Sequence, residues 1–131
     1  MIIPGWLGHS KSSYVVSLAK KLVDSRFEVV RITLRDHGET CHLNSGLFHS
    51  AETQEVVDLI KKLADDFKVR HPNQGGDLTA GLVGFSMGGN FALRVARELP
   101  SVRTLAISPS LSPQKTIQKL SLIHISEPTR P

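Results

Sequence analysis

Residues 84–88 of the chain read Gly-Phe-Ser-Met-Gly, which is a Gly-x-Ser-x-Gly spacing. Residues 78–85 are largely apolar and predict a strand, and residues 90–99 predict a helix. Between a strand and a helix, this spacing is typical of a tight turn that exposes a nucleophilic serine, with glycines that let neighbouring backbone pass without a Cβ clash. Ser86 is therefore the candidate nucleophile, and the Met87 amide, at a helix start, is a candidate donor to an oxyanion. The alternative is a glycine-rich turn with a capping serine.

The rest of the chain alternates between strand and helix patterns. In chain order we expect an apolar strand at residues 1–4, a helix from Ser12 or Ser13 to about Ser25, a β-branched strand at 28–34, a polar loop at 35–48, a helix from Ser50 to about Lys68, the strand and helix around Ser86, and a strand at 102–107. This alternation is the pattern of a parallel sheet with right-handed crossovers. The fold class we predict is α/β, a three-layer sandwich with a mostly parallel sheet.

A second donor to an oxyanion is expected from the loop after an earlier strand. Residues 4–8, Pro-Gly-Trp-Leu-Gly, follow the first expected strand, and the Trp6 amide is the candidate donor there. The alternative is a simple turn with the Trp6 side chain packed as a lid on apolar neighbours. The two interpretations are compatible.

No histidine is placed by the strand order where it would serve as a general base for Ser86. The six are His9, His37, His42, His49, His71 and His124. The histidines in loops are interpreted as hydrogen-bonding groups rather than as bases. The acidic side chains that we interpret as solvated are Asp36, Asp65, Asp66 and Asp77.

Composition and charge exclude several classes of protein. The 131 residues carry a formal net charge of +4 and 40% are hydrophobic, which is the composition of one globular domain rather than of a disordered chain. No apolar run reaches a bilayer-spanning length and no basic segment precedes the first apolar residues, so a cytoplasmic protein without a membrane span is expected. The basic residues form no stripe, which argues against nucleic acid as a partner. Cys41 is the only cysteine, so an internal disulfide or a cysteine zinc site is impossible.

Three motifs together resemble the α/β-hydrolase superfamily. They are the turn at residues 84–90, the Arg-Asp-His-Gly-Glu-Thr loop at 35–40 and the Gly-Leu-Phe-His-Ser segment at 46–50. The Gly-Phe-Ser-x-Gly-Gly-Asn turn and the Phe-His-Ser segment are similar to the YheT-like branch of predicted esterases. This similarity spans about residues 1–119.

The resemblance implies a serine hydrolase that acts on carboxylic esters or related small acyl compounds. Ser86 would be the nucleophile, the Trp6 and Met87 amides would form the oxyanion hole, and no metal or organic cofactor would be required. Pro4 and Gly5 stand where many members have His-Gly, which leaves the donor amide intact.

In that superfamily the catalytic acid and histidine follow later strands than the one expected at residues 102–107. The chain is therefore expected to be an incomplete fragment, with a partial hydrolase domain at residues 1–120, and to be inactive alone. Residues 121–131, Ser-Leu-Ile-His-Ile-Ser-Glu-Pro-Thr-Arg-Pro, closely resemble translated sequencing adapter and are expected to be a non-native tail. The alternatives left open are a non-catalytic hydrolase-like binding module, a truncated product with exposed sheet edges, and an acyltransferase or peptidase with the same turn.

Overall fold

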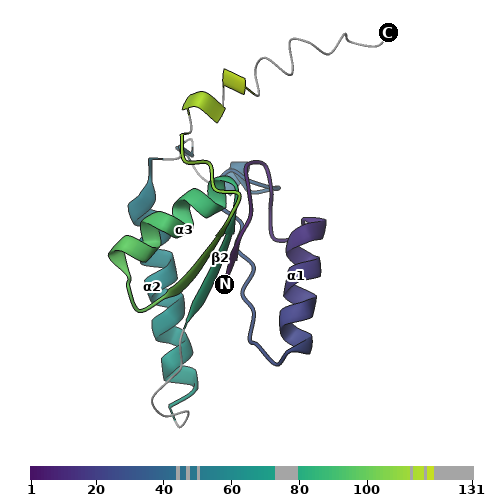
Figure 1. The fold of residues 1–131 in the computed structure, drawn as a ribbon, viewed down its shortest axis with the longest axis vertical. Helices are drawn as coiled ribbons and strands as arrows, with labels where there is room; N and C mark the ends of the chain where they lie inside the picture. The colour runs from purple at the N-terminus through teal and green to yellow at the C-terminus, as the bar shows by residue number, and fades with distance from the viewer. Residues whose placement is uncertain are drawn as a thin grey trace.

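A computed structural model of the chain describes residues 1–43, 45–46, 48–49, 51–72, 80–112, 114–116 and 118–119 (Figure 1). Some expectations fall on residues outside this set: the first residues of the strand at 78–79, the helix start at Ser50, Asp77 and the tail at 121–131. Within the described ranges, no helix has the length and apolar character needed to cross a membrane.

The sheet is parallel and runs in the order β1 (Ile2–Ile3), β2 (Gly81–Phe85) and β3 (Arg103–Ile107). β1 is short because Pro4, which follows it, has no backbone N–H with which to continue the ladder. Since all three strands run in the same direction, their carboxyl ends meet at one edge of the sheet. Ser86, directly after β2, lies at that edge, as the sequence predicts.

Residues 28–34, which we expect to be a strand, form an extended segment beside β1 instead. The Ile2 N–H donates to the Val30 carbonyl and the Ile32 N–H donates to the Ile2 carbonyl, each at 2.9 Å. These bonds make a single bridge, between Ile2 and Arg31. A two-residue strand offers too few backbone groups for a longer ladder, so the prediction of a regular strand is wrong while its place beside β1 is right.

The three expected helices are present as α1 (Ser13–Asp24), α2 (Thr53–Arg70) and α3 (Met87–Glu98), with a 3₁₀ turn η1 (Cys41–Leu43) in the long loop. α3 begins three residues earlier than we expect. Ser86 is itself the N-cap residue, and its carbonyl accepts a hydrogen bond from the Asn90 N–H at 3.0 Å. The connection from β2 to α3 is therefore a single residue.

Ser12 occupies the N-cap position of α1, but its side chain does not cap the helix. Its Oγ instead accepts a hydrogen bond from the His9 N–H at 3.0 Å. The serine therefore orders the loop that leads into α1, where the sequence predicted a helix cap.

Helices cover both faces of the sheet and make three layers (Figure 1). α2 and α3 lie on one face, where Ile3, Leu82 and Phe91 belong to the main buried core. α1 lies on the other face, where Ile2 packs with Val15. Burial of each large apolar side chain contributes roughly 1.5–3 kcal/mol to stability. The predicted three-layer α/β fold is confirmed.

An exposed cluster of charges joins the extended segment 28–34 to the end of α2. The Glu28 carboxylate accepts hydrogen bonds from Arg70 and from His71, the latter at 3.0 Å. The Arg70 hydrogen bond first, and the His71 hydrogen bond second, hold the pKa of the Glu28 carboxyl below its ordinary value of 4.5. Because the pKa is lowered in the folded state, the ionised carboxylate stabilises the fold.

We predict that Glu28→Gln lowers stability at pH 7 and that the difference from the parent chain disappears in acid. The contribution of a carboxyl with a lowered pKa is fully present above its unfolded value and is lost as the pH falls through the folded value. Urea unfolding of both chains at pH 7 and well below pH 4.5 measures this difference. Glu98→Gln is the control, because Glu98 is exposed and pairs only loosely with its neighbour Arg97. A difference that persists undiminished in acid would contradict the electrostatic origin.

Candidate active site

Ser86 is held in an uncommon backbone conformation between β2 and α3. Its φ of 51° and ψ of −112° lie in a region that residues with a side chain rarely adopt. Its N–H donates to the Ile107 carbonyl at 2.9 Å, and its carbonyl also accepts from the Ser110 N–H at 3.1 Å. The side chain is exposed, and within the described part of the chain its hydroxyl makes no hydrogen bond. The turn is thus fixed through its backbone, which leaves the Oγ free to react.

The two glycines of the Gly-x-Ser-x-Gly spacing are required by contact. A Cβ on Gly84 would lie 2.1 Å from the Gly88 carbonyl oxygen, and a Cβ on Gly88 would lie 2.3 Å from the Pro4 carbonyl oxygen. Both contacts are with backbone, which cannot rotate away as a side chain can. The first turn of α3 therefore packs directly on the ends of β1 and β2, as the spacing predicts.

The loop after β1 lies against Ser86. A Cβ on Gly5 would be 3.3 Å from the Ser86 Cβ and 3.4 Å from the Phe85 carbonyl oxygen, so the backbone of Gly5 passes close to the serine. The Gly8 N–H donates to the Gly5 carbonyl at 3.0 Å and closes a turn in which Leu7 has a φ of 60°. Trp6 is 51% exposed, so about half of its surface faces solvent. The turn that contains Trp6 therefore begins beside the candidate nucleophile.

Two backbone amides beside Ser86 are available to a ligand. Among the described residues, neither the Trp6 N–H nor the Met87 N–H donates a hydrogen bond. Met87 is the first residue of α3, where N–H groups have no partner within the helix and the helix dipole is positive. N–H groups at such a position can donate hydrogen bonds to an anion.

A comparison with protein families agrees with this geometry. Residues 2–130 match the model of a family described as Alpha/beta hydrolase family. The chain belongs to the alpha/beta hydrolase family. No curated protein matches the chain. The family match establishes a hydrolase-like fold for this chain.

None of the described histidines makes a hydrogen bond to Ser86. His9 lies in the loop before α1, where its Nδ1 accepts a hydrogen bond from the Lys11 N–H at 3.2 Å. His49 pairs with Glu52 at 3.4 Å, and His71 pairs with Glu28 as described above. His42 lies in η1 and is exposed. Within the described ranges, His9, His49 and His71 thus bind a loop amide or an acidic side chain.

His37 differs from the others because it is only 5% exposed. Its Nδ1 lies 2.8 Å from the Arg35 carbonyl, and since a carbonyl can only accept, the proton of the neutral ring is on Nδ1. Its Nε2 is buried and has no hydrogen-bond partner among the described residues. The ring packs edge-on against Phe48, with 5.0 Å between the ring centroids. It supports the loop from the inside, which periodicity in the sequence could not reveal.

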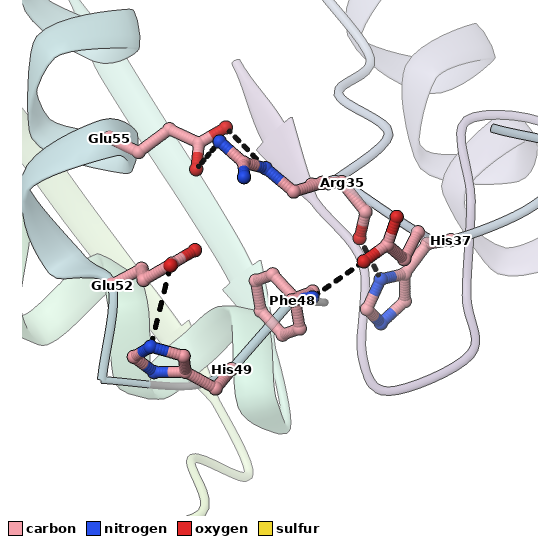
Figure 2. A network of polar contacts seen from close by, with 7 residues as sticks. Arg35, His37, Phe48, His49, Glu52 and Glu55 are labelled. Atoms are coloured by element: carbon pink, nitrogen blue, oxygen red, sulfur yellow. Dashed lines mark hydrogen bonds and ion pairs between the residues drawn. The ribbon is translucent and has the colours of Figure 1, made fainter. Parts of the chain in front are cut away.

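A network of polar contacts attaches this loop to α2 (Figure 2). The Arg35 guanidinium pairs with Glu55 at 2.9 Å, and the Asp36 carboxylate accepts a hydrogen bond from the Phe48 N–H. The interpretation of Asp36 as a solvated carboxylate is therefore wrong, because it orders a main-chain group twelve residues away. Asp36 directly follows the extended segment and has a φ of 58°. Aspartate tolerates this backbone conformation better than most residues do, so an aspartate at this position was the sequence signal for an ordered turn.

A small hollow lies beside this network. Its volume is about 50 Å³, and it is lined by residues of the loop and of α2 that include Thr33, Arg35, Phe48 and Glu55. That volume accommodates water-sized molecules and not an ester. Over the described residues, no group of three or more histidine, cysteine or acidic side chains is arranged to hold a metal ion.

We predict that Gly88→Ala destabilises the chain by about 3 kcal/mol or more, because the added methyl meets the backbone of β1 and Pro4. Gly81→Ala is the matched control: it also lies in the β2 to α3 region, but its nearest neighbouring atom would be 4.0 Å away. Circular dichroism during thermal unfolding compares the three chains. Equal melting temperatures for the two alanine variants would contradict the steric role of Gly88.

We also predict that Ser86→Gly is more stable than the parent chain by about 1 kcal/mol, while Ser86→Ala is not. Both variants remove the hydroxyl, but only glycine relieves the conformation at a φ of 51°. Chemical denaturation of the three chains measures the difference. If the alanine variant gains as much stability as the glycine variant, the backbone of Ser86 is unstrained.

Proposed function

We propose that this chain carries the nucleophile and oxyanion hole of a serine hydrolase that acts on carboxylic esters or related small acyl compounds. Its similarity to the YheT-like branch of predicted esterases supports this class of substrate. The observation on which the proposal rests is the exposed Ser86 in its strained turn, in contact with the loop of Trp6 and followed by α3. Strain at an exposed hydroxyl is retained where it serves function.

In the mechanism that we propose, the Ser86 Oγ attacks the acyl carbon and its proton passes to a general base. The carbonyl electron pair moves to oxygen, and the Trp6 and Met87 amides donate hydrogen bonds to the oxyanion that forms. Expulsion of the alcohol with a returned proton leaves an acyl-serine, which water hydrolyses. Each amide is worth roughly 100–1,000-fold in rate, as measured for comparable donors in other enzymes.

A second candidate is a non-catalytic hydrolase-like binding module. It is favoured by the absence of any contact between Ser86 and a histidine within the described ranges. A serine without a base keeps its position but loses most of its reactivity, because loss of the base removes most of the rate. The two candidates differ in whether Ser86 forms a covalent adduct.

We predict that a fluorophosphonate labels Ser86 alone, slowly and with one equivalent per chain, because its phosphoryl oxygen resembles the oxyanion that the two amides would stabilise. Peptide mapping by mass spectrometry locates the adduct. Ser86→Ala should remain unlabelled, and Ser110→Ala, which removes a neighbouring hydroxyl, should label as the parent does. Label on another serine, or none on Ser86 of the folded chain, would favour the binding module.

We further predict that the chain turns over p-nitrophenyl acetate no faster than Ser86→Ala does, since none of the described residues makes a hydrogen bond to the Ser86 hydroxyl as a general base would. Steady-state absorbance measurements compare the two. Turnover that depends on Ser86 would show that a histidine of this chain serves as the base, and substitutions of His37 and His9 would then identify it.

A further inference from the structure

Tyr14 connects the loop after β1 to the strand that carries Ser86. Its hydroxyl oxygen accepts a hydrogen bond from the Gly5 N–H at 3.0 Å. Its ring meets the Phe85 ring edge-on, with 5.0 Å between the centroids and an angle of 69° between the planes. Phe85 immediately precedes Ser86 in the chain. One side chain therefore contacts both the turn that contains Trp6 and the residue before the nucleophile.

The turn is shaped around the hydroxyl of Tyr14. A Cβ on Gly8 would lie 2.4 Å from the Tyr14 oxygen, so the hydroxyl occupies the space that a larger residue at position 8 would need. Gly5 and Gly8 are the two ends of the turn, joined by their own hydrogen bond at 3.0 Å. The hydroxyl thus contacts both ends of the turn, while a Cβ added at Gly5 would lie 3.3 Å from the Ser86 Cβ.

Tyr14 is not part of the buried core. It is 39% exposed, whereas its neighbour Val15 is fully buried against Ile2. A phenylalanine would make the same edge contact with Phe85, and only the hydroxyl can accept the Gly5 hydrogen bond. What a tyrosine adds at this position is therefore the polar contact with the turn.

We propose that Tyr14 is a positioning residue that sets the distance between the Trp6 amide and the Ser86 Oγ. The inference rests on the proposed function, because that distance matters only if the amide stabilises an oxyanion on an atom bonded to Ser86. By accepting from Gly5, the hydroxyl satisfies the first amide of the turn and fixes the peptide plane next to it. The Trp6 N–H is then the free donor, in an orientation tied to β2 through Phe85.

The experiment is Tyr14→Phe in the full chain, read in three ways. Trp6 is the only tryptophan, so its fluorescence reports on this turn alone. We expect lower anisotropy of Trp6, faster hydrogen exchange of the Gly5 amide, and roughly tenfold slower fluorophosphonate labelling of Ser86, since a misplaced donor loses part of its effect. The melting temperature should change by no more than a few degrees, which excludes unfolding as the cause.

Thr104→Val is the matched control, because it also removes one hydroxyl with a single backbone contact, to the Val102 carbonyl at 3.1 Å, but at the other end of β3. It should leave all three readings unchanged. If Gly5 exchange and Trp6 anisotropy in Tyr14→Phe equal those of the parent, the inference is overturned whether or not Ser86 is labelled. If both change and the labelling rate does not, Tyr14 orders the turn without serving Ser86, and the inference is likewise overturned.

The failure of the proposed function has a different signature. In that case Ser86 stays unlabelled in the parent chain, in Tyr14→Phe and in Thr104→Val alike. The Gly5 and Trp6 readings are independent of any reaction and still decide whether the Tyr14 hydroxyl holds the turn.

Discussion

The close approach of three backbone segments at Gly84 and Gly88 is the constraint on which the rest of the structure depends. The first turn of α3 lies so near the end of β1 that a single methyl on Gly88 would meet the carbonyl oxygens of Ile3 and Pro4 at 2.6 and 2.3 Å. Because β1 ends there, the loop that follows it must start beside the turn of Ser86. The candidate nucleophile and the candidate oxyanion loop are therefore placed by one contact, and neither needs the long loop at residues 35–49.

Of the five described non-glycine residues with positive φ angles, Leu7, Ser86 and Ser108 follow the strands at this edge of the sheet, and the other two are Arg26 and Asp36. Ser86 and Leu7 both have positive φ angles, of 51° and 60°, although neither is a glycine. Conformations of this kind cost about 1–3 kcal/mol each and persist only when their surroundings fix them. Here the burial of Phe91 and Val95 in α3 anchors the helix, and each such side chain contributes roughly 1.5–3 kcal/mol. The core beneath the turn is thus strong enough to hold both residues in place.

Local sequence patterns predicted what depends on local chemistry. The helical spacing of α1 and the glycines around Ser86 were sufficient to predict the helix, the turn and the parallel α/β fold. The segment at 28–34 has β-branched residues, but its pairing depends on how many residues β1 offers, and Pro4 limits that to one bridge. The contacts of Asp36 and His37 were not predicted for a related reason. Asp36 binds the Phe48 amide and His37 packs on the Phe48 ring, and Phe48 lies at the far end of a loop that has no sequence periodicity.

The electrostatic and the proton-transfer halves of an acyl-transfer site have different origins in this fold. In the site that we propose, the Trp6 and Met87 amides belong to segments that follow β1 and β2, so parallel pairing of those strands would bring them toward Ser86 without help from distant elements. A general base has no such local route, and no described histidine reaches the serine. In enzymes that lose a member of the triad, the oxyanion hole and binding alone still give about 10³–10⁴-fold over water. A site with donors and no base therefore stabilises a tetrahedral adduct better than it forms one, which is why adduct formation and turnover separate the candidate functions.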